Sequence, residues 1–157
     1  MYRSKAKGRH RYSLFRDCEE MAAPPPWIEV DALHRIGVAR LDRQHQKLVR
    51  LANTLNDAVK AGRSMPTVRH LFDQLVRYLR HHFSTEEQLM QRHGYPDYGT
   101  HGKAHAGAIL EIARLRERLE HGAEFVALQA IKDWLVDHVR TMDRPMGEFL
   151  SRIGELH

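Results

Sequence analysis

The sequence contains one cysteine and no long apolar run. Because Cys18 is the only thiol among 157 residues, no disulfide can form within the chain, which is typical of proteins from a reducing compartment. No stretch approaches the roughly 20 consecutive apolar residues that a membrane-spanning helix needs. The first residues also lack the apolar segment of a secretory signal peptide. We therefore expect a cytoplasmic protein that does not interact with a membrane.

The formal net charge of +5 is unevenly distributed along the chain. Residues 1–26 contain six Lys or Arg residues and three acidic residues, a balance of +3, and they end in three consecutive prolines. This composition predicts a basic, flexible N-terminal extension at 1–26, followed by one domain at 27–157. The charge of the extension is the only feature that favours nucleic acid as a partner, so we do not expect one.

Beyond residue 26, apolar residues recur every three or four positions, which is the period of an amphipathic helix. The pattern predicts four helices, at about residues 42–61, 66–92, 99–120 and 123–143. The last is expected to end before Pro145, because a residue that precedes proline disfavours the α conformation. Long helices with short connections pack as antiparallel neighbours, and no strand pattern competes. The predicted fold class is therefore all-α, an antiparallel up-down-up-down four-helix bundle.

The sequence is rich in histidine, with twelve residues, and histidine is the commonest metal ligand. Seven residues of ligand type lie along the apolar faces of the predicted helices: His45, His82, Glu86, His101, His105, His138 and Asp143. Residues four apart lie on one side of a helix, so the pairs His82 with Glu86 and His101 with His105 can each converge on one point. Every predicted helix contributes at least one candidate ligand.

Each candidate ligand has a simpler explanation as a core histidine or carboxylate with a hydrogen-bond partner. Left unpaired on an apolar face, such a group would cost several kcal/mol. A single residue is better explained in this way, but seven spread over all four helices favour a metal centre. Imidazole and carboxylate ligands without cysteine suit iron and argue against an iron–sulfur cluster, although manganese and zinc stay open.

The spacing of His138 and Asp143 requires a distorted helix. Five residues correspond to about 140° around an ideal α-helix, so the two side chains would point to different sides. They can share a site only if the last turn loosens or bulges, which Pro145 would promote. We therefore predict a distorted helix end at this position.

Four sequence runs resemble the motifs of the hemerythrin family, in particular those of bacteriohemerythrins. They are Asp42-Arg43-Gln44-His45, His82-Phe83-Ser84-Thr85-Glu86-Glu87-Gln88-Leu89-Met90, His101-x3-His105 and Trp134-Leu135-x2-His138-x4-Asp143, within a similarity that extends from Trp27 to about residue 146. The resemblance implies two iron ions bridged by an oxo or hydroxo group. It places one iron on His101, His105 and His138 and the other on His45 and His82, with Glu86 and Asp143 bridging the pair.

With this ligand set, one coordination position stays open on the iron that has only two histidines, and dioxygen could bind there. Oxygen-activating, carboxylate-rich bundles use Glu-x-x-His motifs, which this sequence lacks. The sequence therefore predicts a non-haem di-iron protein that reversibly binds dioxygen for storage, delivery or sensing, and not an enzyme; an oxygen-consuming enzyme is a candidate recipient. The alternatives are a di-iron oxidase or peroxide-handling enzyme, and an iron- or oxygen-gated regulatory protein that uses the basic extension.

The resemblance also implies an oxygen pocket beside the metal ions. We expect its wall to be formed by four residues: Leu48, Phe83, Ala108 and Trp134. Ala108 and Met146 stand where members of the family often carry an aromatic residue, so both are expected to open the pocket. Asp42 and Gln44 lie beside His45 in the sequence, and we expect them either to orient its imidazole without binding the metal themselves or to be surface polar residues at the start of the helix.

Overall fold

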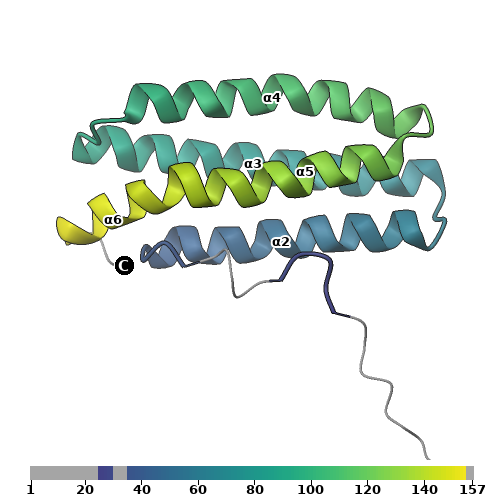
Figure 1. Cartoon of the computed structure of the whole chain (residues 1–157), viewed down its shortest axis with the longest axis horizontal. Coiled ribbons are helices and arrows are strands. Elements are labelled where there is room, and N and C mark those ends of the chain that lie inside the picture. The colour runs from purple at the N-terminus through teal and green to yellow at the C-terminus, as the bar shows by residue number, and fades with distance from the viewer. Residues whose placement is uncertain (1–24, 30–34, 155–157) are drawn as a thin grey trace, which may run out of the picture.

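The computed structural model describes residues 25–29 and 35–154, and these residues fold into an antiparallel helical bundle. Its four main helices lie side by side and are joined at alternate ends (Figure 1). They are α2 (Ala39–Lys60), α3 (Met65–His93), α4 (Tyr98–Glu120) and α5 (Glu124–His138). No strand occurs among the residues that the structure describes. The predicted all-α, up-down-up-down four-helix bundle is confirmed.

The first three helices begin and end within three residues of their predicted limits. Pro66 occupies the first turn of α3, where its missing N–H would have had no partner within the helix. Gly94 ends α3 in the left-handed conformation, with φ at 65°, and its N–H donates to the carbonyl of Gln91 at 3.3 Å. Sharp helix ends of this kind keep the connections short, and short connections make successive helices run antiparallel.

The fourth helix differs from its prediction at the C-terminal end. Residues Val139–Asp143 form a π-helical turn, η1, and the chain then continues as α6 (Arg144–Arg152). The predicted distortion is confirmed, but the predicted end of the helix before Pro145 is wrong. Arg144 keeps helical angles, φ −61° and ψ −50°, because the wider π turn leaves room for the proline ring. Pro145 itself lies in the first turn of α6, where no N–H is needed.

Two apolar clusters fill the bundle on either side of a band of polar residues. Along α2, Leu41 belongs to one cluster and Leu48 to the other, and the buried His45 lies between them. The same order is repeated on α3 around Glu86, which is completely buried. The polar band is therefore separated from water by apolar layers at both ends.

A short segment that precedes α2 joins α2 to α5. Asn53 of α2 accepts the backbone N–H of Ile28 at 2.9 Å and donates to its carbonyl at 3.0 Å. Lys132 of α5 donates to the carbonyl of Trp27 at 2.7 Å. These bonds hold the Ile28 side chain in the core, where it is only 2% exposed.

Most of the predicted N-terminal extension, residues 1–24 with Cys18, lies outside the described residues. The boundary between 1–26 and 27–157 therefore stays a prediction. None of the described helices combines the length and the apolar character that crossing a membrane requires.

Candidate metal centre

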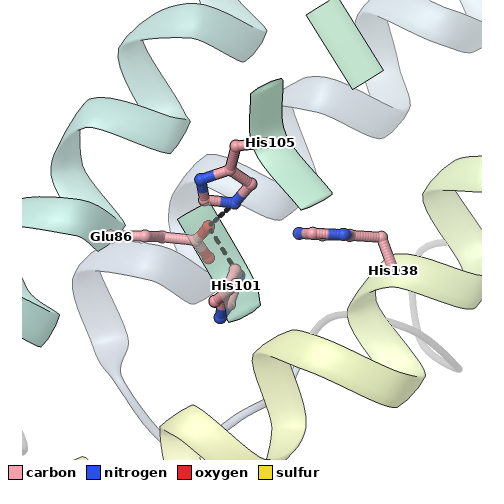
Figure 2. A group of neighbouring side chains, drawn as sticks. All are labelled: Glu86, His101, His105 and His138. Atoms are coloured by element: carbon pink, nitrogen blue, oxygen red, sulfur yellow. Dashed lines mark ion pairs between the residues drawn. The ribbon is translucent and has the colours of Figure 1, made fainter. Parts of the chain in front are cut away.

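The structure gathers the seven predicted ligand residues into one buried cluster, in which no side chain is more than 5% exposed. Their ligand atoms fall into two groups, and within each group the atoms lie within 4.8 Å of one another. One group contains Glu86, His101, His105 and His138 (Figure 2). The other contains His45, His82, Glu86 and Asp143. Because Glu86 belongs to both groups, the cluster offers two adjoining cation sites.

Asp143 directs one carboxylate oxygen to each group of histidines. Its Oδ1 atom lies 3.2 Å from Nε2 of both His101 and His138. Its Oδ2 atom lies 3.2 Å from Nε2 of His45. The carboxylate of Asp143 therefore spans the space between the two groups.

Glu86 divides its two oxygen atoms in the same way. Its Oε1 atom lies 3.3 Å from Nε2 of His82 and 3.9 Å from Nε2 of His45. Its Oε2 atom lies 3.1 Å from Nε2 of His105 and 3.7 Å from Nε2 of His101. Two carboxylates that each face both groups have the arrangement that bridging ligands require.

Most atoms that face this centre lack a hydrogen-bond partner. Within the described part of the chain, no hydrogen bond of regular geometry reaches either carboxylate oxygen of Glu86 or Asp143, although all four oxygens are buried and histidine Nε2 atoms lie close to them. The same holds for Nε2 of four histidines: His45, His101, His105 and His138. Buried polar atoms without partners are costly, and cations between them would remove that cost. The residues present therefore fit a pair of metal ions.

Helix geometry explains how single helices supply several of these side chains. His82 and Glu86 lie four residues apart on α3, so they point to the same side, and α4 repeats this spacing. His138 and Asp143 are five residues apart and are connected by the π turn. Because hydrogen bonds in a π-helix run between residues five apart, the turn returns Asp143 to the side of His138.

Two histidines are oriented by hydrogen bonds on the side away from the centre. Nδ1 of His82 lies 3.0 Å from Oε1 of Gln44, whose amide nitrogen donates to the hydroxyl of Thr85 at 3.1 Å. Nδ1 of His105 lies 3.0 Å from Oε1 of Glu87. Both contacts leave Nε2 as the atom that faces the centre. From the sequence, Glu87 is either a solvated carboxylate or one that supports a ligand, and its contact with His105 decides for the second; Thr85 had no signal beyond its position next to Glu86.

The expected role of Asp42 and Gln44 is corrected by these contacts. Gln44 bonds to His82 and not to His45, because neighbouring residues on a helix point about 100° apart and Gln44 faces α3. Asp42 accepts the backbone N–H of Ile36 through Oδ1 at 2.8 Å. That bond fixes the backbone of the segment that leads into α2. It is not directed at the imidazole of His45.

His82 and His101 differ strongly in basicity. Burial lowers the pKa of His82 to about 4 and outweighs the attraction of Glu86. Burial also acts to lower the pKa of His101, but the Asp143 and Glu86 carboxylates raise it to about 9. In the metal-free chain at neutral pH, His82 is therefore neutral and His101 is a cation between two carboxylates.

Both carboxylates are ionised at neutral pH. Burial and the charge of Asp143 act to raise the pKa of Glu86, but the surrounding histidines lower it to about 2. Burial opposes ionisation of Asp143 as well, yet the histidines that face it, His101 first among them, hold its pKa well below the ordinary value. Ionised oxygens among imidazoles form a donor set that attracts divalent transition metals.

A cavity of about 20 Å³ adjoins the donor atoms. Three of the four predicted wall residues line it, namely Leu48, Phe83 and Trp134, and so do Ile28 and Leu135, which the sequence analysis missed. Apart from the candidate ligands, every residue that lines the cavity is apolar. The volume corresponds to about one molecule of the size of water.

Two aromatic rings that line this cavity also stack on histidines of the candidate metal centre. The Trp134 ring stacks on His138, with 4.6 Å between ring centroids and 21° between planes. The Phe83 ring stacks on His105 at 3.9 Å and 10°. Stacking of this kind restricts the rotation of both imidazoles and leaves their nitrogen atoms directed at the centre.

Ala108 and Met146 do not open this cavity, contrary to expectation. Ala108 lines a separate cavity among α3, α4 and α5, because it lies about one helical turn beyond His105, away from the donor atoms. Met146 is completely buried in the apolar cluster that also contains Ile36 and Leu150. The π turn and α6 carry Met146 past the centre into that cluster.

This chain is an antiparallel helical bundle that buries imidazoles and carboxylates around one centre. These features place it in the class of helical-bundle metal-binding proteins. The family model described as the hemerythrin HHE cation binding domain matches residues 36–150. This chain belongs to the hemerythrin family.

Individual relatives agree with this assignment. The chain is 30% identical to bacteriohemerythrin from Methylococcus capsulatus over 128 residues, which cover 80% of this chain and 95% of that protein. It is 35% identical to myohemerythrin from Sipunculus nudus over 120 residues, 76% of this chain and 90% of that protein. A crystal structure of wild-type hemerythrin matches with a TM-score of 0.69 and 28% identity, and the match covers 76% of this chain and 94% of that one.

Proposed function

We propose that this chain is a non-haem di-iron protein that binds dioxygen reversibly, for storage, delivery or sensing. The observation that carries the proposal is the division of the Glu86 and Asp143 oxygens between two groups of histidines, with the facing atoms left without hydrogen-bond partners. Membership of the hemerythrin family supports the choice of iron and dioxygen over other metals and ligands.

The proposed ligand assignment follows the two groups of donor atoms. His101, His105 and His138 would hold one iron and His45 and His82 the other, and the Glu86 and Asp143 carboxylates, which face both groups, would be shared between them. When bound and reduced, such a pair of irons would supply the electrons and a coordination position for reversible binding of dioxygen.

The chain itself protects that position from water and protons. Leu48, Phe83 and Trp134 line the adjoining cavity, and among the described residues that line it only the candidate ligands carry acid–base groups. Loss of oxygen as hydrogen peroxide consumes protons, so an apolar wall favours the release of intact dioxygen. The small volume of the cavity, about 20 Å³, supports a carrier over an oxidase that acts on an organic substrate.

The proposal is tested by metal analysis together with optical spectra. The full chain is loaded with iron, reduced without air, exposed to air and then degassed. We expect two irons per chain and a charge-transfer band that appears in air, disappears on degassing and returns on re-exposure. Sustained turnover of added peroxide without such a band would favour the enzymatic alternative, and an iron-loaded, reduced chain that shows no band in air would contradict the proposed binding of dioxygen.

A further inference from the structure

A second cavity, of about 50 Å³, lies among α3, α4 and α5, and α4 packs against both of the other helices (Figure 1). None of the candidate metal ligands lines it. Of its lining residues only Glu111 is charged, and the Glu111 side chain is 42% exposed and lies 3.1 Å from the guanidinium of Arg114. The buried side of the cavity, which includes Leu115 and Ile131, is entirely apolar.

The cavity exists because Ala108 has a small side chain at a position that faces the core. Ala108 is 5% exposed and is the smallest buried residue among those that line the cavity. Protein interiors are otherwise close-packed, and a void deprives its walls of dispersion contacts. A molecule of suitable size and polarity would restore those contacts.

The lining selects an apolar occupant over water. A buried water molecule needs two to four polar partners, and the buried side of this cavity offers none. Apolar cavities in proteins stay dry and take up apolar molecules such as xenon. We propose that the cavity beside Ala108 is a binding site for a small apolar gas molecule; that the gas is dioxygen rests on the proposed function.

The position of this site connects it to the candidate metal centre. Leu79, Trp134 and Leu135 line both this cavity and the smaller one beside the donor atoms, so a single layer of side chains separates the two. On the outer side, Val76 and Ile112 are partly exposed. Rotamer changes of side chains such as Leu79 and Leu135 allow a gas molecule to pass the layer between the cavities. The gas site therefore lies on a route from solvent to the metal centre.

The site is tested directly with xenon as the probe. Crystals of the full chain are pressurised with xenon, and xenon is located by its anomalous scattering. We expect xenon beside Ala108 in the wild type, no xenon in Ala108→Leu, which fills the cavity, and unchanged xenon in Ala113→Leu, which places the same side chain on an exposed position of α4. Ala108→Val serves as a smaller filling variant if the leucine variant does not fold. Absence of xenon from the wild-type cavity would overturn the site.

The route is tested by the kinetics of the iron-loaded, reduced chain. Mixing with dioxygen in a stopped-flow instrument should show association several-fold slower in Ala108→Leu than in the wild type, with dissociation slowed to a similar extent and Ala113→Leu unchanged. Xenon beside Ala108 combined with unaltered rates in Ala108→Leu would overturn the route. Because xenon binding requires no metal chemistry, a chain that holds xenon but never binds dioxygen would refute the proposed function and leave the gas site standing.

Discussion

The Nδ1 atom of His82 on α3 lies 3.0 Å from Oε1 of Gln44 on α2, in a part of the core where both side chains are buried. The Thr85 hydroxyl donates to the carbonyl of His81 and accepts from the amide nitrogen of Gln44, so the amide oxygen is the end that faces His82. This pairing makes His82 donate through Nδ1 and present Nε2 to the centre. It also links two helices at the level of the candidate ligands.

Replacing Gln44 by leucine should weaken metal binding without removing a ligand. The substitution keeps the size of the side chain but removes the acceptor that orients His82, and losses of this kind typically cost about 10- to 100-fold in metal affinity. Competition with a chelator measures the affinity. Gln88→Leu is the matched control, because Gln88 is exposed on α3 and its amide donates to the hydroxyl of Ser84, away from the candidate ligands. Equal affinities in the wild type and in Gln44→Leu would contradict the orienting role.

His81 and His82 are neighbours in sequence, but only the substitution of His82 should change the metal content. His82 is 2% exposed and faces Glu86 at 3.3 Å, whereas His81 is exposed and lies 3.4 Å from the Gln44 amide nitrogen, on the outer side of that amide. We expect His82→Ala to lose metal and His81→Ala to retain it, as measured by elemental analysis of the purified variants. Retention of the full metal content by His82→Ala would remove His82 from the ligand set.

The metal-free chain should become less stable as the pH rises from neutral to alkaline. The pKa of His101 is raised from 6.5 to about 9 in the folded chain, so its proton contributes stability below pH 6.5 that is lost as the pH rises through 9. At about 1.4 kcal/mol per pKa unit, the loss in unfolding free energy is at most about 3–4 kcal/mol.

Urea unfolding of the metal-free chain at several pH values measures this dependence. His101→Gln should flatten the alkaline decline, and metal loading should abolish it, because a cation then replaces the proton between the carboxylates. A metal-free chain that gains stability between pH 7 and 9 would show that the proton on His101 has the opposite effect.

Two glycine-to-alanine substitutions should change stability in opposite directions. A Cβ atom at Gly147 would lie 2.2 Å from the carbonyl oxygen of Ile36, so Gly147→Ala forces backbone apart and should destabilise the fold by about 1–3 kcal/mol. Gly107 is exposed on α4 with nothing near its Cβ position, and Gly107→Ala should stabilise by about 0.5–1 kcal/mol. Thermal unfolding measures both. If Gly147→Ala left the unfolding temperature unchanged, α6 and the segment before α2 would not be packed as closely as the structure places them.

Local backbone geometry explains how much of the site could be predicted. The spacing of His82 from Glu86 places both on one side of any α-helix, whatever surrounds it. The five-residue spacing of His138 and Asp143 required a distortion, and the π turn supplies it. The partner of Gln44 could not be predicted, because that contact depends on how α2 and α3 are rotated against each other.

The sequence by itself determined the helices, their antiparallel order and the residues that can act as ligands, because periodicity and turn chemistry are properties of neighbouring residues. Only the tertiary structure decided which carboxylate oxygen faces which histidine, that Ala108 leaves a separate cavity, and that the chain stays helical beyond Pro145. The physical reason is that the packing of the whole core sets the separation and rotation of the helices. Ångström-scale differences in helix position, which no local pattern encodes, decide which side chains meet.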